Sequence, residues 1–229
     1  MSGRSVVVTG GFGALGRAVA TAFTKQGDRV ARIDFAPAPS EPPADGFDVG
    51  GIDLADERAA GGAIRLIVDR LGGIDVLINI AGGFVWQPID EGGIPVWRRM
   101  FEMNLLSTVN VTSLALPLLR QASAGRIVNV GAGAAVQAGA GMGAYAASKA
   151  GVHKMTEALA SELAGTATTV NAVLPSIIDT PTNRADMPDA DHRIWVQPDA
   201  VADVVLFLAS PSARAVHGAL IPVARGDVV

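Results

Sequence analysis

Tyr145 and Lys149 stand four residues apart in the sequence YAASK, at the start of a predicted helix. Residues at this spacing share one face of a helix, so the tyrosine hydroxyl and the lysine ammonium can meet there. A free tyrosine titrates near ~10, and a cation held nearby favours the phenolate and lowers the pKa of the hydroxyl. Such a pair can pass a proton to or from a substrate. The alternative interpretation is an ordinary surface pair on an amphipathic helix.

A glycine-rich loop near residue 10 is the second chemical signal. A short β-branched run at 5–9 precedes the loop, and a helical pattern at 17–26 follows it. Glycines let the backbone approach a pyrophosphate closely, and a helix N-terminus offers free N–H groups and a positive dipole end. This context predicts a dinucleotide site, whereas a tight turn that needs glycine for geometry alone is the alternative. The loop residues are Gly10, Gly11, Phe12, Gly13, Ala14, Leu15 and Gly16.

Asp34 ends the next predicted strand, residues 29–34, and lies 18 residues beyond Gly16. A carboxylate at this position accepts hydrogen bonds from the adenosine ribose hydroxyls and repels a 2′-phosphate. The sequence therefore favours NAD(H) over NADP(H). Arg17 and Arg32 are the counter-argument, because arginine binds phosphate well, although each is as readily a solvated surface charge.

The remainder of the chain alternates predicted strands and helices. This alternation implies a doubly wound, Rossmann-type parallel sheet of about seven strands with helices on both faces, in a single domain over residues 1–229. Ligands of such sheets bind beyond the carboxyl ends of the strands. The further strands are predicted at 47–49, 74–80, 168–174 and 217–224, with one more at the start of the stretch 125–151, and the further helices at 56–71, 97–120, 145–163 and 199–209.

Several residues that follow these strands are expected at the same edge. Asp53 suits either a contact with the adenine edge or a helix N-cap. Asn104, on the helix predicted at 97–120, either bridges backbone or water in the core or serves a proton relay. Residues 182–197 are expected to form a substrate-facing loop. Besides Asp53, Tyr145 and Lys149, the expected cofactor contacts are Leu54, Asn79, Ala81, Gly82, Gly83, Pro175, Ser176, Ile177 and Thr180.

Composition narrows the classes of partner. The 229 residues are 49% hydrophobic and 17% charged, which suits one well-filled domain. A net charge of -4 without a Lys/Arg run argues against nucleic acid or an anionic membrane, so a small molecule is the expected partner. There is no cysteine, and the three histidines lack metal-binding spacing, so no metal is expected. The apolar runs are too short to span a membrane, and we expect a cytoplasmic location.

These motifs resemble the short-chain dehydrogenase/reductase family over nearly the whole chain. The resemblance lies in TGGFGALG at 9–16, NIAG at 79–82, Asn104, YAASK and residues 175–180. It implies an NAD(P)-dependent oxidoreductase in which Tyr145 donates or accepts the proton. It further implies that Lys149 holds the nicotinamide ribose and lowers the tyrosine pKa, and that Asn104 anchors a proton-relay water. It also implies a homodimer or homotetramer formed through the helices that carry Asn104 and Tyr145.

Two departures from the family pattern are similar to its dihydropteridine reductase branch. The family usually has a serine 13 residues before the tyrosine, where this chain has Ala132, and a glycine where it has Ala14. The loop DTPTNRADMPDAD at 179–191, followed by Trp195, also resembles this branch, whereas Asn104 and the helix predicted at 199–209 fit the general family better.

Ala132 distinguishes the functional hypotheses. A carbonyl reductase develops negative charge on the substrate oxygen, and losing one preorganised donor costs ~10²–10³ in rate. A quinonoid dihydropterin is an activated electrophile that takes hydride into its ring system, and Tyr145 alone could supply the proton. An NADH-dependent reductase of this substrate is therefore the leading prediction. The alternatives are a general family member acting on a carbonyl, alcohol or quinone, and a catalytically silent NAD(H)-binding protein. Besides Ala132, the tentative substrate residues are Phe84, Trp86 and Trp195, which either wall a flat heterocycle or belong to the core.

Overall fold

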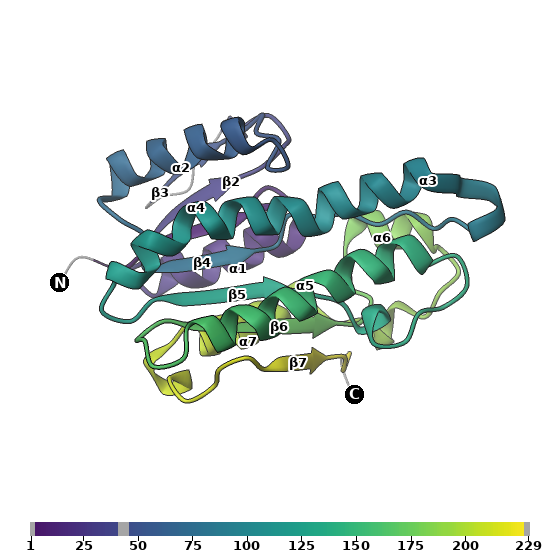
Figure 1. Ribbon diagram of the computed structural model, residues 1–229. Helices are drawn as coiled ribbons and strands as arrows, with labels where there is room; N and C mark the ends of the chain where they lie inside the picture. Colours follow the sequence, from purple (N-terminus) through teal and green to yellow (C-terminus); the bar gives the residue numbers. More distant parts are fainter. Residues whose placement is uncertain (1–2, 41–45, 227–229) are drawn as a thin grey trace.

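The structure is a computed structural model that describes residues 3–40 and 46–226. Its seven strands are parallel and form one sheet in the order β3-β2-β1-β4-β5-β6-β7, with helices on both faces (Figure 1). This confirms the predicted Rossmann-type fold. The strands are β1 Ser5–Thr9, β2 Arg29–Ile33, β3 Gly46–Val49, β4 Val76–Asn79, β5 Arg126–Val130, β6 Thr169–Pro175 and β7 Leu220–Val223.

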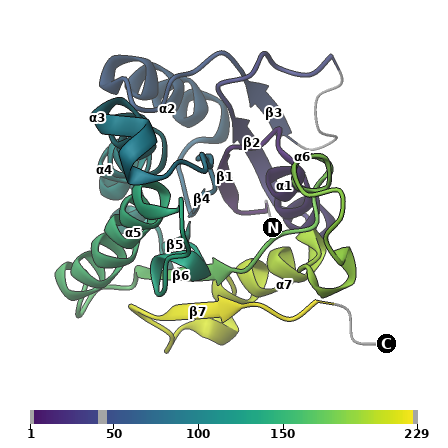
Figure 2. The same ribbon diagram turned by 90° about the vertical axis from the view of Figure 1, so that its right-hand side faces the viewer.

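The central strands are continuous apolar runs because helices cover both of their faces. In β1, Val7 packs into one core cluster, whereas Val6 and Val8 pack into the other, as the alternation of side chains along a strand requires. Figure 2 looks along the sheet and shows the two helical layers on opposite sides. Helices α2 (Glu57–Leu71), α4 (Ser107–Gln121) and α5 (Gly143–Glu162) build the first cluster, and α1 (Ala14–Lys25) and α7 (Pro198–Leu208) build the second.

The helix that carries Asn104 is longer and less regular than predicted. It starts with α3 (Ile89–Met100), continues through the π-helical turn η1 (Phe101–Leu106) and ends with α4. Gly93, at φ 56°, breaks the regular geometry near its start. The N-terminal extension of this helix to Ile89 was not predicted because glycine and proline, which occur at residues 88–95, are typical helix breakers.

Residues 182–197, predicted as a loop, contain two short helical segments. Helix α6 (Pro181–Asp186) begins after Thr180, whose side-chain oxygen accepts the Asn183 N–H at 3.1 Å. Proline at the first helical position suits this start because the missing N–H would be unpaired there anyway. A 3₁₀ turn, η3 (His192–Ile194), follows. Over residues 3–40 and 46–226, none of the helices has both the length and the apolar character needed to cross a bilayer.

Candidate active site

A cavity of about 790 Å³ lies beside the glycine loop at the carboxyl edge of the sheet. It unites residues that follow β1, β2 and β4, as the topology of a parallel sheet predicts. The helix that carries Asn104 forms the side of the cavity opposite the glycine loop. Three residues of this helix that were not predicted as contacts, Arg99, Met103 and Ser107, line the cavity there. Of the predicted cofactor contacts, the lining contains Gly10, Phe12, Gly13, Ala14, Leu15, Gly16, Asp34, Asp53, Leu54, Ala81 and Gly82.

The glycine loop has the geometry of a close backbone cradle. Gly10 has φ 64°, and a Cβ there would lie 2.9 Å from the Ala81 nitrogen. A Cβ on Gly16 would lie 2.1 Å from the Gly10 oxygen, so both positions require glycine. Helix α1 begins after Gly13 without a side-chain cap, which leaves first-turn N–H groups for an anion. The loop therefore fits a dinucleotide phosphate.

Two carboxylates beside the cavity have different local roles. Asp34 accepts the N–H of Phe12 at 2.9 Å and of Ala36 at 3.1 Å, so it fixes the glycine loop as well as lining the cavity. Asp53 is exposed and accepts only the N–H of Ala55, at 2.9 Å. The N-cap of α2 is Asp56, so the N-cap alternative for Asp53 is wrong.

The two arginines that argued for NADP(H) are both engaged within the protein. Arg32 is buried and forms two 2.7 Å bonds to Asp48, and its guanidinium lies over the Phe12 ring at 5.6 Å. Arg17 is exposed, and its Nε donates to the Phe12 carbonyl at 2.7 Å. Arg32 is therefore not the solvated surface charge that was the alternative.

Tyr145 and Lys149 lie on one face of α5, but they are not an exposed pair. Lys149 is 5% exposed, and its Nζ donates to the Val130 carbonyl at 2.8 Å. Burial lowers the pKa of Lys149 to about 8 and raises the pKa of Tyr145 to about 12. The expected lowering of the tyrosine pKa by Lys149 is therefore wrong for this structure, because the ammonium is directed at Val130 and desolvation of the phenol dominates.

Asn104 is fully buried within the π-helical turn and links two parts of the site. Its Oδ1 accepts the Gly83 N–H at 2.9 Å, and its Nδ2 donates to the Gly83 carbonyl at 3.1 Å and to Ser148 Oγ at 2.9 Å. Ser148 in turn donates to the Tyr145 carbonyl at 2.7 Å. A Cβ on Gly82 would lie 2.4 Å from Oδ1, so glycine is needed for this approach. The amide bridges backbone, which is one of the two roles predicted for it.

Asn79 does not face the cavity, contrary to its predicted role as a cofactor contact. Its side chain is buried and donates to Thr112 Oγ1 at 3.0 Å and to Asn129 Oδ1 at 2.8 Å. It thereby ties β4 to α4 and β5. The alternation of β4 places the Asn79 side chain on the face of the sheet that α4 covers, so it is part of the core.

The predicted contacts after β6 lie outside the cavity lining. Pro175 is buried at the end of β6, Ser176 is exposed, Ile177 is 42% exposed and Thr180 caps α6. Their backbone leads into the segment that contains α6. Gly11 and Gly83 also lie outside the lining, although a Cβ on Gly11 would meet the Arg32 side chain at 2.5 Å.

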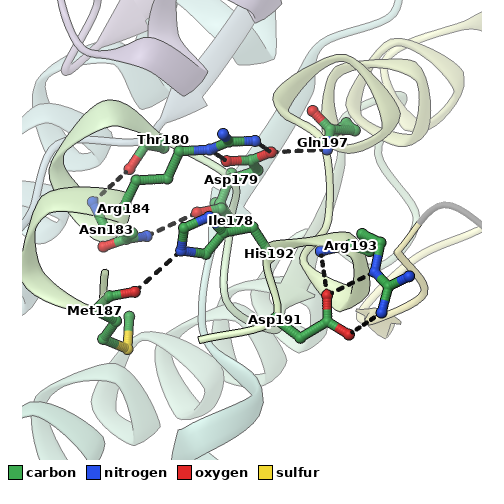
Figure 3. A network of polar contacts seen from close by, with 10 residues as sticks. All are labelled: Ile178, Asp179, Thr180, Asn183, Arg184, Met187, Asp191, His192, Arg193 and Gln197. Atoms are coloured by element: carbon green, nitrogen blue, oxygen red, sulfur yellow. Dashed lines mark hydrogen bonds and ion pairs between the residues drawn. The ribbon is translucent and has the colours of Figure 1, made fainter. Parts of the chain in front are cut away.

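A network of polar contacts holds the segment around α6 in place (Figure 3). The Asp179 carboxylate binds the Arg184 guanidinium through two bonds of 2.5 and 2.7 Å and accepts the Gln197 amide at 3.0 Å. These bonds hold the pKa of Asp179 well below its usual range. His192 Nε2 lies 3.0 Å from the Met187 carbonyl. The substrate-facing loop predicted here is thus an ordered segment.

The three aromatic residues predicted to contact the substrate differ in burial and in their contacts. Phe84 is 48% exposed and meets the Tyr145 ring edge-on, with centroids 5.0 Å apart. Trp86 is 58% exposed and lies against the loop before α5, where its Nε1 donates to a backbone carbonyl at 2.9 Å. Trp195 is 2% exposed and packs against His192 at 4.3 Å. Its predicted role as a substrate wall is wrong, because this ring belongs to the core.

Ala132 is buried at the end of β5, and its backbone N–H donates to His153 Nε2 at 3.3 Å. Neither His153 nor Ser148 was predicted. Ser148 lies within the YAASK motif, and His153 continues the four-residue spacing from Tyr145 through Lys149, which was the available signal. Within the described ranges, no three histidine, cysteine or acidic side chains gather closely enough to hold a metal.

The short chain dehydrogenase family matches residues 4–191, and the chain belongs to this family. It is therefore an NAD(P)-dependent oxidoreductase, and a small-molecule substrate is typical of the family. The 2,3-dihydroxy-2,3-dihydro-p-cumate dehydrogenase of Pseudomonas putida is 30% identical, over 100% of this chain and 96% of that protein.

Two solved structures are similar in fold. The aldohexose dehydrogenase of Thermoplasma acidophilum has a TM-score of 0.87 and 28% identity, over 96% of this chain and 92% of the other. The 3-ketoacyl-(acyl-carrier-protein) reductase of Brucella melitensis, complexed with NADH, has a TM-score of 0.86 and 24% identity, over 97% of both chains. The second likeness concerns the fold alone.

Proposed function

We propose that the chain acts as a single-domain NADH-dependent reductase of a small, uncharged, conjugated ring, with a quinonoid dihydropterin as the leading candidate. The observation that carries this proposal is the surroundings of Tyr145. Residues 80–89, which include Phe84, and residues 127–148, which include Tyr145 itself, contain no Asp, Glu, Lys or Arg. The ring of Phe84 lies against Tyr145, and Ala132 replaces the hydroxyl that would polarise a ketone. A neutral, already activated substrate suits such a site.

The residues around the cavity fit a dinucleotide. The uncapped start of α1 and the cradle at Gly10 and Gly16 would hold the pyrophosphate, and Asp34 would meet the adenosine ribose. A cofactor bound there supplies the hydride. Asp34 favours NADH because its negative charge would repel a 2′-phosphate. Arg32 is unsuited to bind that phosphate because its guanidinium is already paired with Asp48.

Tyr145 is suited to donating a proton rather than accepting one. With its pKa raised to about 12, the phenol remains protonated at neutral pH. A protonated phenol can supply the proton that a substrate takes up in a reduction, which supports the reductive direction of the proposal. Lys149, one turn further along α5, is the candidate to stabilise the phenolate left after the transfer.

A second candidate is the oxidation of a cyclic alcohol or diol. The relative from Pseudomonas putida favours it, because that protein is named as a dehydrogenase of a dihydroxy-dihydro ring compound and matches along the whole chain. The apolar surroundings of Tyr145 suit this ring as well. The two candidates differ in direction, since oxidation requires Tyr145 to lose its proton first.

A homodimer or homotetramer formed through α4 and α5 is also part of the proposal. These helices form a groove lined by the apolar residues Val109, Leu116, Met155, Ala158 and Leu159 and the polar residues Thr112, Ser113 and Glu162. Small and apolar side chains of this kind allow close packing of helices. Light scattering of the purified chain would measure the mass of the assembly.

The decisive experiment follows NADH oxidation with freshly generated quinonoid dihydropterin, beside NADPH, simple ketones and quinones, and a cyclic diol with NAD⁺. Tyr145→Phe should lose about 10²–10⁴-fold in kcat/KM while binding NADH within about threefold of wild type. Because Tyr145 is the only tyrosine, loss of tyrosine absorption verifies the variant. Turnover of the diol alone would select the second candidate. Tight NADH binding without turnover of any compound would select the silent nucleotide-binding protein.

A further inference from the structure

His153 extends the face of α5 that carries Tyr145 and Lys149. Its ring is buried against the end of β5, where Nε2 accepts the Ala132 N–H at 3.3 Å. Lys149 Nζ donates to the Val130 carbonyl at 2.8 Å. Two successive turns of α5 therefore bind the backbone on both sides of Gly131, at Val130 and at Ala132. Ala132 stands at the position where the family usually has its serine.

The Ala132 N–H needs this partner because the sheet ends one residue earlier. Gly131 N–H donates to the Val173 carbonyl of β6 at 2.9 Å, and the paired register of β5 and β6 ends at Val130. Ala132 is buried, so an unpaired N–H there would be unfavourable. The imidazole supplies the acceptor that a neighbouring strand would otherwise provide.

Gly131 makes room for the imidazole. A Cβ at this position would lie 2.3 Å from His153 Nε2 and 2.6 Å from its Cδ2. Because Nε2 accepts a hydrogen bond, the ring is neutral and carries its proton on Nδ1. Burial, and to a smaller extent the Lys149 ammonium, lowers the pKa of His153, which fits the neutral form. Gly131 and His153 therefore act together.

We propose that His153 is a positioning residue for the reaction at Tyr145. It fixes the backbone of Ala132 and of the following turn η2 (Gly133–Ala135), which packs against α5. Ala132 and η2 therefore keep their position although residue 132 has no side-chain donor. The substrate then lies in one orientation against Tyr145. The inference rests on the proposed function, because it concerns the orientation of whichever substrate Tyr145 serves.

The test compares His153→Leu with His153→Gln. Leucine removes the acceptor, whereas glutamine can place an oxygen near the position of Nε2. We expect the leucine variant to lose about tenfold or more in kcat with the KM for NADH within about twofold, and the glutamine variant to remain within about threefold of wild type. Amide hydrogen exchange should show that leucine, but not glutamine, removes the protection of Ala132.

His217 provides a control at an exposed position. Its Nδ1 accepts the Val170 N–H of β6 at 3.3 Å, which is the same kind of bond at the opposite edge of the sheet, and its Nε2 lies 2.7 Å from the Ala160 carbonyl. His217→Leu should leave kcat unchanged. Equal slowing in this control, or full activity of His153→Leu, or a glutamine variant as slow as leucine, would overturn the inference.

Two further outcomes separate this inference from the proposed function. If the wild-type chain turns over no acceptor, the proposed function fails and the role of His153 fails with it. If the wild type is active and His153→Leu equally so, only the inference about His153 is wrong. Should the leucine variant not fold, Gly131→Ala gives the same test, because its Cβ would displace the imidazole, and normal activity there would contradict the inference.

Discussion

Replacing the buried Lys149 by methionine should stabilise the fold while removing activity. Burial lowers the pKa of this ammonium from 10.5 to about 8. Each tenfold change in proton affinity is about 1.4 kcal/mol, so the charged form carries a penalty of roughly 3 kcal/mol at neutral pH. The bond to the Val130 carbonyl returns about 1–2 kcal/mol. We therefore expect Lys149→Met to raise the free energy of unfolding by about 1–2 kcal/mol.

This gain should disappear as the pH rises. Below about pH 8 the folded and unfolded chains both hold the Lys149 proton, so the wild type bears the full penalty. Between about 8 and 10.5 the unfolded chain holds a proton that the folded chain has released. The stability of the wild type therefore rises with pH in this window, relative to a variant that has no ammonium.

Urea unfolding of both proteins at several pH values across this window measures the effect. Lys154→Met is the matched control on the same helix, because the Lys154 side chain is 77% exposed and pairs only with Glu157 at the surface. Its effect should stay within about 0.5 kcal/mol at every pH. A Lys149→Met variant that is less stable than wild type at neutral pH, by an amount independent of pH, would refute the reasoning.

Four further substitutions test other parts of the site and of the fold. Ala132→Ser adds a donor at the usual serine position, so the rate of NADH oxidation with a simple ketone should rise about tenfold or more; no gain would contradict our interpretation of Ala132. Asp34→Ser removes a carboxylate that would repel a 2′-phosphate, so the ratio of kcat/KM for NADH over NADPH should fall at least about tenfold. Trp195→Ala should lower the free energy of unfolding by about 3–5 kcal/mol, whereas Trp86→Ala, at an exposed ring, should lower it by less than about 1 kcal/mol in the same urea titration.

The glycine loop and Asp34 could be predicted from the sequence because their chemistry is local. A strand, several glycines and a helix follow one another within about twenty residues, and the next strand ends at the acid. The edge at which they meet follows from the parallel topology alone. The same local character made the start of α2 predictable, although its cap is Asp56 and not Asp53.

The features that could not be predicted depend on three-dimensional surroundings. Trp195 is a core residue because the segment after α6 returns to pair at Ile178, just beyond β6, which its own neighbours in sequence do not show. The tyrosine pKa depends on a competition between burial and the direction of Lys149, and spacing specifies only that the two side chains share a face. His153 binds a backbone N–H, and such a bond is decided by where β5 ends.

The strand order has a consequence for how the chain is made. Starting from β1, each later strand attaches to an outer edge of those already present, first β2 and β3 on one side and then β4 to β7 on the other. A nascent chain can therefore enlarge its sheet outward as it leaves the ribosome. Until β7 pairs with it, β6 is an edge strand with unpaired backbone N–H and C=O groups. A chain on a ribosome stalled before Leu220 would expose this apolar edge strand and would be prone to aggregate.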